Sequence, residues 1–462
     1  MLQRVVNLIP SSLSGEANQD SEPNLAVNPT NTDQMVATAF TPDPLQGPNA
    51  PIYVSTDGGQ TWALRTVVPG NGPVGTGDIS VGFSTGSGIL YVGILSANAP
   101  ANQTRLQILR NTSYLSTATM PVLVDRLDVD QPWVVATSVP GQAGQAADHV
   151  YVGNNDLGGQ PKTATIDFSL NGAAATAAAG FTSHRIETVN TAGQDGPPIR
   201  IGLHPSGTVY AVHQRWTHTS GNTITFEVVV TRDDNWGSAA NPFSALTDPS
   251  DGSVGMRAAT HLTAVWNGSM GHERLGADSA IAVDPTNHDV VWIAWGDQPG
   301  GPSAPWTTHV RRSTDGGQTW SGDLRKVSKG KNPCLAVNAA GQLGFLCQAL
   351  TGTGTAQRWQ TTFEVTTDGW TTPVTPTVLH TALASNPVPA FLPYLGDYAR
   401  VIAVDTAFYG VFSGNNHPDK ANFPNGITYQ RNVDWNAHQL LDLDGTTAVP
   451  DSIDPFFFAW TE

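Results

Sequence analysis

An eight-residue segment occurs twice in this chain, letter for letter, and this repeat restricts the fold more than any other feature. The segment Ser-Thr-Asp-Gly-Gly-Gln-Thr-Trp stands at residues 55–62 and again at 313–320. Weaker copies stand at 366–372 and 231–236. Internal repetition of this kind is typical of a fold that stacks similar units around or along an axis.

A second pattern precedes each copy at a nearly constant distance. An apolar run that ends in a turn residue comes about 30 residues before the aspartate of the repeat, as Asn28 does before Asp57 and Asp284 before Asp315. Between the two motifs lies another apolar run, and apolar residues also enter and leave the repeat. Four short strands in each unit predict the blade of a β-propeller.

Units without the repeat keep the same frame, which gives seven blade starts in the chain. We therefore expect an all-β propeller of seven four-stranded antiparallel blades, with six as the alternative if one stretch is an insertion. Residues 1–462 are expected to form one domain, closed by a strand from residues 4–8 or 456–460. The segment 254–274 is longer than a blade connection needs and is interpreted as an inter-blade insertion. The 47 glycines and 33 prolines suit the many turns of such a fold.

Charge and hydropathy narrow the range of partners. The formal net charge of −16 disfavours nucleic acid and anionic membrane surfaces. No run of 18 apolar residues could span a membrane. Residues 1–7 do not look like a signal peptide, and the sequence alone does not choose a compartment.

The two cysteines, Cys334 and Cys347, flank a short hairpin. A tight turn at residues 340–341 would place them opposite each other on antiparallel strands, so a cross-strand disulfide is sterically allowed. Two buried free thiols are the alternative. The spacing is not that of a zinc site.

The repeat resembles the Asp-box, also called the bacterial neuraminidase repeat, and the chain is similar to the sialidase-like propellers found in many bacterial proteins. The resemblance implies that the box residues are structural and peripheral. We expect the aspartates to accept bonds within their own turns and the tryptophans to pack between blades. The residues concerned are Asp57, Trp62, Asp315, Trp320 and Asp368.

Acidic or amide residues mark the start of each expected innermost strand, and a closed ring would bring them to one mouth of the central channel. They are Glu22, Asp78, Asp130, Asp195, Asp278, Asn332 and Asp397. Three interpretations stay open. These side chains cap strand ends, bind a cation such as Ca²⁺, or supply a general acid or base. No resident cofactor is expected, although a bound Ca²⁺ ion stays open because these side chains offer oxygen ligands.

The resemblance also implies a set of catalytic and substrate-binding residues, although the Arg-Ile-Pro motif of sialidases is absent. By analogy Tyr398 is the expected nucleophile and Glu273 its base. The proton donor is Asp78 or Asp130. The residues expected to bind the substrate and its carboxylate are Arg200, Arg274, Arg400, Asp397 and Tyr394.

The leading functional hypothesis is a glycan-recognising propeller that acts on an acidic glycan at the channel mouth. Exo-sialidase-like glycoside hydrolysis is the expected reaction if the protein is an enzyme, and the sequence leaves that condition open. The alternatives are a lectin-like or protein-interaction propeller and a polysaccharide lyase. A carbohydrate or glycoconjugate is the expected partner, a protein partner stays open, and the resemblance favours an extracellular location.

Overall fold

The computed structural model describes residues 1–461 except 42–49, 68–75, 97–98, 101–102, 117–118, 141–145, 190–198 and 266–277. Within this part of the chain, seven antiparallel sheets have four strands each and an eighth has three. Three short 3₁₀ helices, η1 (Ser11–Leu13), η2 (Gly354–Ala356) and η3 (Lys420–Asn422), are the helical elements of the described residues. No helix in those residues is long and apolar enough to cross a bilayer.

Six blades are each built from four strands that follow one another along the chain. Blade one is β2 (Ser21–Val27), β3 (Met35–Phe40), β4 (Ala50–Ser55) and β5 (Ala63–Val67). Blade two is β6 (Thr76–Phe83), β7 (Leu90–Ser96), β8 (Arg105–Asn111) and β9 (Val122–Leu127). Blade three is β10 (Val129–Pro140), β11 (Ala146–Asp156), β12 (Thr163–Ser169) and β13 (Thr182–Arg185).

The next three blades repeat this order. Blade four is β14 (Arg200–Leu203), β15 (Val209–Ser220), β16 (Thr223–Asp233) and β17 (Met256–Val265). Blade five is β18 (Ser279–Asp284), β19 (Asn287–Asp297), β20 (Thr307–Ser313) and β21 (Arg325–Ser328). Blade six is β22 (Gly330–Val337), β23 (Leu343–Thr351), β24 (Arg358–Thr366) and β25 (Thr377–Leu383).

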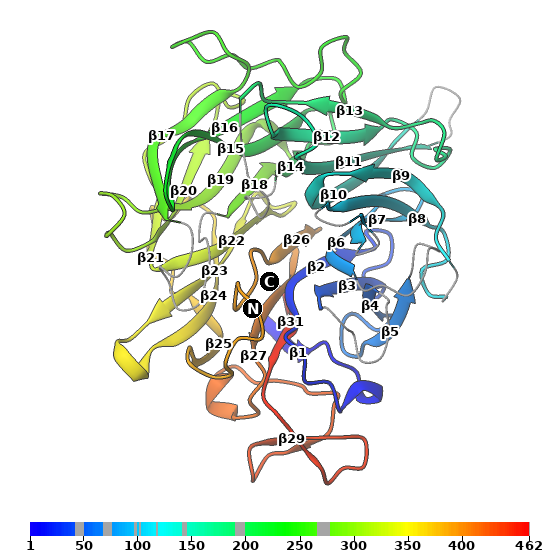
Figure 1. Ribbon diagram of the computed structural model, residues 1–462, viewed down its shortest axis with the longest axis vertical. Helices are drawn as coiled ribbons and strands as arrows, with labels where there is room; N and C mark the ends of the chain where they lie inside the picture. Colours follow the sequence, from blue (N-terminus) through cyan, green and yellow to red (C-terminus); the bar gives the residue numbers. More distant parts are fainter. Residues whose placement is uncertain are drawn as a thin grey trace.

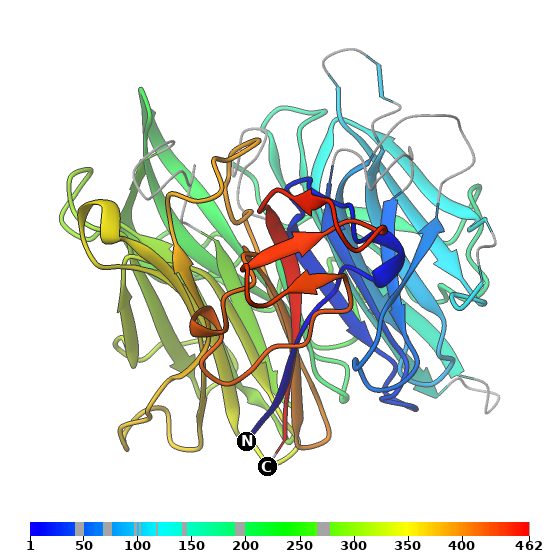
Figure 2. The same ribbon diagram turned by 90° about the horizontal axis from the view of Figure 1, so that it is seen from below.

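The seventh blade joins the two ends of the chain. Its strands are β26 (Arg400–Val404), β27 (Ala407–Asn415), β31 (Ile453–Trp460) and, outermost, β1 (Leu2–Asn7). The three-stranded sheet of β28 (Val433–Asp434), β29 (Gln439–Leu441) and β30 (Ala448–Val449) is inserted between β27 and β31. Both termini lie at the same end of the molecule (Figure 2).

The first strands of the blades form a closed cycle. Each contacts the first strand of the next blade, from β2 through β6, β10, β14, β18 and β22 to β26, and β26 contacts β2 again. Figure 1 shows the blades arranged around this centre. The predicted all-β propeller with seven four-stranded blades is therefore confirmed, and the six-bladed alternative is wrong. The first strand of every blade starts at one end of the ring, which we call the entry end. It finishes at the opposite end, which we call the turn end.

Burial explains the apolar runs in the inner strands, such as Leu25–Val27 of β2 and Cys334–Val337 of β22. A blade packs between two neighbours, so both of its faces are covered. Every residue of β2 and of β22 is buried. One apolar cluster combines Ala26 and Val36 of blade one with Ile79 and Val81 of blade two, and similar clusters fill the other blade contacts.

The expected insertion and the cysteine pair can now be located. Residues 256–265 of the segment 254–274 form β17, the outermost strand of blade four, while residues 266–274 lie outside the described residues. The two thiols are free and buried. A register shift between Lys331 and Cys334 pairs Cys334 with Leu346, so Cys334 does not face Cys347 across the ladder and no disulfide forms.

Candidate functional site

The repeat turns lie between the third and fourth strands of their blades, away from the central channel. The Asp57 carboxylate accepts bonds from the backbone N–H groups of Gln60 and Thr61 at 3.0 and 2.9 Å and from the Thr61 hydroxyl at 2.6 Å. The Asp315 and Asp368 carboxylates each accept from the backbone N–H and hydroxyl of the threonine four residues on, Thr319 and Thr372. These bonds lower the pKa of Asp57 against the opposing effect of partial burial.

Gly59 shows why this turn needs glycine. Its φ is +80°, and an added Cβ would lie 2.3 Å from the Phe457 ring of blade seven. Trp62 packs edge-on against the same ring at 5.4 Å, so the turn fastens blade one to blade seven. Trp320 is half-buried against the apolar cluster that includes residues of blades four and five.

The acidic and amide residues at the strand starts do not all occupy equivalent positions, because bulges interrupt the first strands there. Glu22, Gln131 and Asn332 each adopt a positive φ, between 49 and 57°, directly before a proline. The register shifts at these points in β2, β10 and β22, and at residues 76–79 of β6. Asp78 and Asp130 therefore stand one residue after and one residue before the position of Glu22.

A segment of the chain, Gly396–Tyr398, fills the entry end of the channel, and we call it the plug. The Gly396 carbonyl accepts bonds from the Lys331 Nζ at 2.8 Å and from the Asn332 amide at 3.2 Å, both on blade six. The Asp397 N–H donates to Glu22 on blade one at 2.9 Å. All three plug residues are buried.

Tyr398 extends the plug to further blades. Its hydroxyl donates to the Asp78 carboxylate of blade two at 3.1 Å, and its ring meets Trp133 of blade three edge-on at 5.8 Å. The Arg200 guanidinium of blade four lies 5.3 Å from the same ring. The mouth that the sequence predicted is thus where the strand starts converge, but in the described residues it is packed rather than open.

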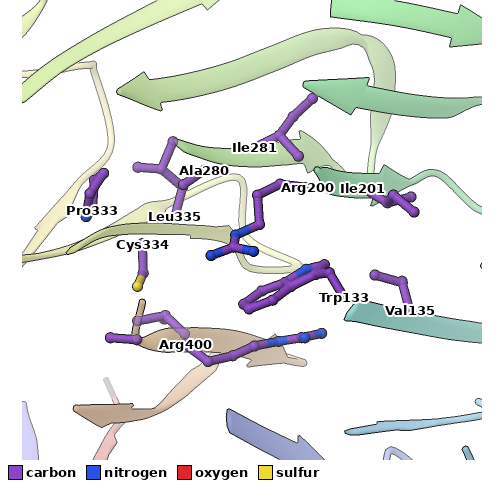
Figure 3. Close-up of a pocket in the computed structure, with 12 residues that line it drawn as sticks. Trp133, Val135, Arg200, Ile201, Ala280, Ile281, Pro333, Cys334, Leu335 and Arg400 are labelled. Atoms are coloured by element: carbon purple, nitrogen blue, oxygen red, sulfur yellow. The ribbon is translucent and has the colours of Figure 1, made fainter. Parts of the chain in front are cut away.

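Two arginines and one tryptophan form a stack in the channel (Figure 3). The Arg200 guanidinium lies 3.6 Å from the centre of the Trp133 ring, and the Arg400 guanidinium lies 4.4 Å from it. Arg400 comes from blade seven and reaches across the channel to the Val134 carbonyl of blade three at 3.3 Å. Guanidinium groups favour the face of an indole ring, so Trp133 orients both cations.

The stack borders a cavity of about 120 Å³ in the centre of the ring. Five first strands, those of blades three to seven, supply its walls. Among the described residues that line the cavity, Arg200 and Arg400 are the charged ones. The Cys334 side chain also lines the cavity (Figure 3). Apolar residues such as Val135, Ile201, Ile281 and Leu335 complete the lining.

The positive charges of Arg200 and Arg400 are compensated to different extents. Arg200 pairs with the buried Asp278 at 3.0 Å, yet its Nη1 has no hydrogen-bond partner among the described residues. Arg400 has no carboxylate partner among the described residues, and its hydrogen bonds go to the Asn24 side chain and the Val134 carbonyl. Burial and the neighbouring Arg200 lower the pKa of Arg400 to about 9. The cavity therefore presents positive charge that the protein compensates only in part.

At the entry end, the surroundings also shift the pKa values of a carboxyl group and of a tyrosine hydroxyl. Burial raises the pKa of Asp278 to about 6, against the lowering effect of Arg200, and Asp397 raises it further. Burial and the Asp78 and Glu22 carboxylates raise the pKa of the Tyr398 hydroxyl well above its ordinary value. Tyr398 is thus protonated in this state and donates its hydrogen to Asp78.

The other predicted site residues are placed as follows. Asp130 is buried, and its carboxylate accepts the backbone N–H of Gln131 at 3.0 Å. Tyr394 is buried, and its hydroxyl donates to the Asn386 carbonyl at 2.5 Å, away from the arginines. Glu273, Arg274 and Asp195 lie outside the described residues. The described residues contain no group of three or more His, Cys, Asp or Glu side chains that could hold a metal ion.

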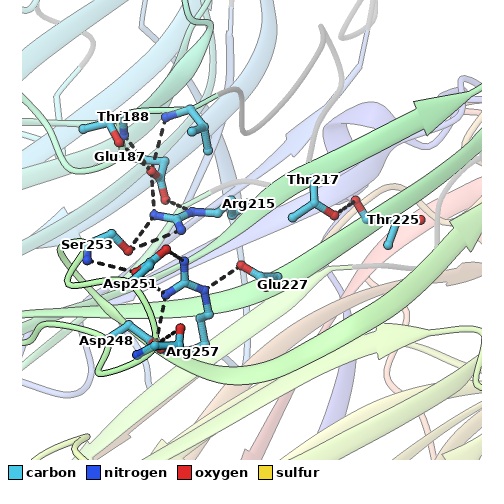
Figure 4. Close-up of polar contacts among 12 residues, drawn as sticks. Glu187, Thr188, Arg215, Thr217, Thr225, Glu227, Asp248, Asp251, Ser253 and Arg257 are labelled. Carbon is cyan, nitrogen blue, oxygen red and sulfur yellow. Dashed lines mark hydrogen bonds and ion pairs between the residues drawn. The ribbon is translucent and has the colours of Figure 1, made fainter.

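A second charged cluster joins blades three and four outside the channel (Figure 4). Glu187, which follows β13, accepts two bonds from Arg215 at 2.6 and 2.9 Å and lies 3.3 Å from His213. Although burial raises the pKa of Glu187, His213 and Arg215 lower it to about 2. Arg257 of β17 pairs with Glu227, Asp248 and Asp251 beside it.

Comparisons with known proteins find matches among solved structures. Neither a protein-family model nor a curated protein matches this sequence. Among solved structures, an alpha-L-arabinanase of Penicillium chrysogenum is 10% identical over 98% of each chain, with a TM-score of 0.45. A Hadza microbial sialidase is 14% identical over 88% of this chain and 65% of the other, with a TM-score of 0.38. An ulvan lyase is 9% identical over 86% and 92%, with a TM-score of 0.47.

At so low an identity, the chemistry has to be argued from this chain's own residues. Those residues define a seven-bladed β-propeller with a positively lined cavity in its central channel. Trp133 is the functional candidate that the sequence reasoning missed. The available signal was its position directly after Gln131-Pro132, at the start of an inner strand, where a large side chain faces the axis.

Proposed function

We propose that the protein binds an acidic glycan in its central channel, with the anionic group held by Arg400 and Arg200 against Trp133. The observation that carries this proposal is the incomplete charge balance of the cavity. Arg400 lacks a carboxylate partner among the described residues, and Arg200 has a buried N–H without an acceptor. An unpaired, half-buried cation and an unsatisfied buried donor are both costly, and a bound carboxylate or sulfate would relieve both.

Arginine is also the cation best suited to this ligand. Its planar guanidinium can donate two parallel hydrogen bonds to a carboxylate or a sulfate. The cavity of about 120 Å³ holds the anionic group, while the sugar ring would extend along the channel. The Asp-box resemblance of residues 55–62 and 313–320 supports a carbohydrate as the carrier of that group.

Calorimetric titration with glucuronate, N-acetylneuraminate and a sulfated sugar tests the proposal, with glucose as the neutral control. We expect the acidic sugars to bind and glucose not to bind. Arg400→Met should weaken the binding of the acidic sugars at least tenfold. Equal binding of glucose, or unchanged affinity in Arg400→Met, would reject the proposal.

Hydrolysis of the bound glycan in the manner of a sialidase is a second candidate, supported by the hydrogen bond from Tyr398 to Asp78. A carboxylate that accepts the tyrosine proton is the partner that a tyrosine nucleophile needs. In this arrangement Asp78 would act as the base for Tyr398 rather than as the proton donor. Asp130 stays the candidate donor, and Glu273 lies outside the described residues.

A panel of fluorogenic glycosides that includes a sialoside separates these functions. Turnover that is lost in Tyr398→Phe and in Asp78→Asn would support hydrolysis. Cleavage of a polyuronate, followed by the ultraviolet absorbance of its unsaturated product, would indicate a lyase instead. Binding of acidic sugars without any turnover would leave a lectin-like propeller.

A further inference from the structure

We propose that ligands reach the Arg200–Arg400 site only from the turn end of the channel, so that the site accepts a free anion or the acidic terminus of a chain and rejects an internal acidic residue. The identity of the ligand rests on the proposed function. The route is a property of the fold and can be tested without any glycan.

The entry end is closed by contacts from the plug to several blades. Gly396 is held by Lys331 and Asn332 of blade six, and Asp397 by Glu22 of blade one. An added Cβ on Gly396 would lie 2.5 Å from the Glu22 backbone nitrogen, which shows how tightly the plug fits. A ligand cannot pass here without breaking buried hydrogen bonds.

Tyr398 completes this barrier on the opposite side of the ring. Tyr398 is 1% exposed. Its hydroxyl donates to Asp78, and its ring contacts Trp133 and the guanidinium of Arg200. Ala399, the next residue along the chain, already lines the cavity. The plug is therefore the floor of the cavity as seen from the turn end.

A second cavity continues the channel in the other direction. Its volume is about 170 Å³, and its walls are the first strands of blades one, two, three and seven. Val135 and Arg400 line both cavities, so the two adjoin. The second cavity reaches Pro29, which is half-buried, and Thr85, which is exposed, in the turns that follow β2 and β6. Among the described residues, the turn end is thus the side where the channel meets solvent.

A channel that is open at the turn end and closed by the plug selects ligands by the position of the acidic group in the chain as well as by its charge. A chain that enters it must end inside, because no continuation can leave through the plug. Apolar walls of the second cavity, such as Leu25, Val27, Val81 and Phe83, would contact the part of the ligand behind the charged terminus. Arg400 and Arg200 then meet only the group that enters first.

Cys334 supplies a direct readout of the route, because it lines the inner cavity, whereas Cys347 is buried outside it. We would label the native protein with an anionic methanethiosulfonate carrying a sulfonate and with a cationic one carrying an ammonium. Peptide mapping would follow the two cysteines separately. We expect the anionic reagent to modify Cys334 at least tenfold faster than the cationic one, and Cys347 to stay unmodified.

Blocking variants identify the open side. Ala136→Trp and Ala403→Trp would each fill the second cavity, whose lining includes both half-buried alanines. Leu392→Trp is the matched control, since Leu392 is 44% exposed shortly before the plug. We expect each blocking variant to slow the labelling of Cys334 at least tenfold and the control to leave it unchanged. A wild-type rate in a folded blocking variant would overturn the proposed route.

The ligand class is tested in a separate step. An oligosaccharide with a terminal uronate should protect Cys334 from labelling, whereas the same oligosaccharide with the uronate capped by a further sugar should protect at least tenfold less well. Equal protection would overturn the selectivity for termini. If the blocking variants slow labelling but no acidic sugar protects, the proposed function fails while the route stands.

Discussion

At the scale of single residues, Arg200 and Arg400 stack on the same ring, but only one of them has a counter-ion. Arg200 is paired with Asp278 in the protein interior, and both side chains are 4% exposed. Arg400 lies against Trp133 with its charge unopposed by a carboxylate of the described residues. The same substitution should therefore cost much more stability at Arg200 than at Arg400.

Arg200→Met is expected to lower the free energy of unfolding by about 3 kcal/mol, because it leaves the Asp278 carboxyl buried without its partner. Arg400→Met should change that free energy by less than about 1 kcal/mol, since methionine keeps the apolar stem and removes a half-buried charge that has no carboxylate partner among the described residues. Urea unfolding of both variants measures the difference. A similar loss of unfolding free energy in both variants would show that groups outside the stack compensate the charge of Arg400.

Glu187 gives a pH dependence with a definite sign. Its pKa is lowered from 4.5 to about 2 in the folded protein, mainly because His213 and Arg215 overcome the effect of burial. A depressed carboxyl pKa stabilises the fold above the unfolded value, and this contribution is lost as the pH falls from 4.5 to about 2. Glu187→Gln should cost about 3 kcal/mol at pH 7 and progressively less below pH 4.5, as chemical unfolding at several pH values would show.

At the scale of the element, each repeat turn stabilises its own blade independently of the other repeat turns. Asp57 and Asp315 each accept several hydrogen bonds within one turn, and the two turns belong to blades one and five. Neither turn contributes to the lining of the central cavities. Their loss should affect stability and leave the channel intact.

We expect Asp57→Ala and Asp315→Ala each to lower the free energy of unfolding by about 1 kcal/mol, because backbone N–H groups lose their acceptor. The double variant should show the sum of the two effects to within about 0.5 kcal/mol, since the sites share no partner. Affinity for acidic sugars should be unchanged. A marked loss of affinity would assign these aspartates a role beyond the turn.

At the scale of the whole molecule, one strand from the start of the chain closes the ring. β1 pairs with β31 from Val5–Phe458 to Asn7–Phe456, and Val5 and Val6 are buried in two different apolar clusters. Without β1, the strand with Phe456, Phe457 and Phe458 would become an unpaired apolar edge, which is an arrangement that favours aggregation.

Removal of residues 2–7 should therefore cause the protein to aggregate, as size-exclusion chromatography would show. A synthetic peptide of residues 1–9 added in trans should restore the soluble form, because it supplies the missing edge. Val5→Asp within that peptide is the control and should abolish the rescue. A soluble, folded protein without β1 and without peptide would show that closure does not depend on this strand.

The sequence predicted the ring but not the chemistry of its centre, and the difference has a physical reason. Blade number followed from local patterns, namely the repeats at 55–62 and 313–320 and the apolar runs at fixed distances from them. The stack on Trp133 depends on which residue a bulge turns toward the axis, and the plug depends on the path of one connection across the ring. Arg200 and Arg400 could be proposed as a pair, whereas the closed entry end could not.

The pairing of β1 with β31 also determines how the molecule would respond to a pulling force. The backbone N–H of Thr461 donates to the Met1 carbonyl at 3.0 Å, so the two ends leave the ring side by side. A force that pulls the two ends apart acts at right angles to β1 and β31. It breaks the hydrogen bonds between these strands one after another, beginning at the Leu2–Trp460 pair. Tethered by its ends, this propeller should yield first at the seventh blade and at a low load, while the six blades made from consecutive strands are still intact.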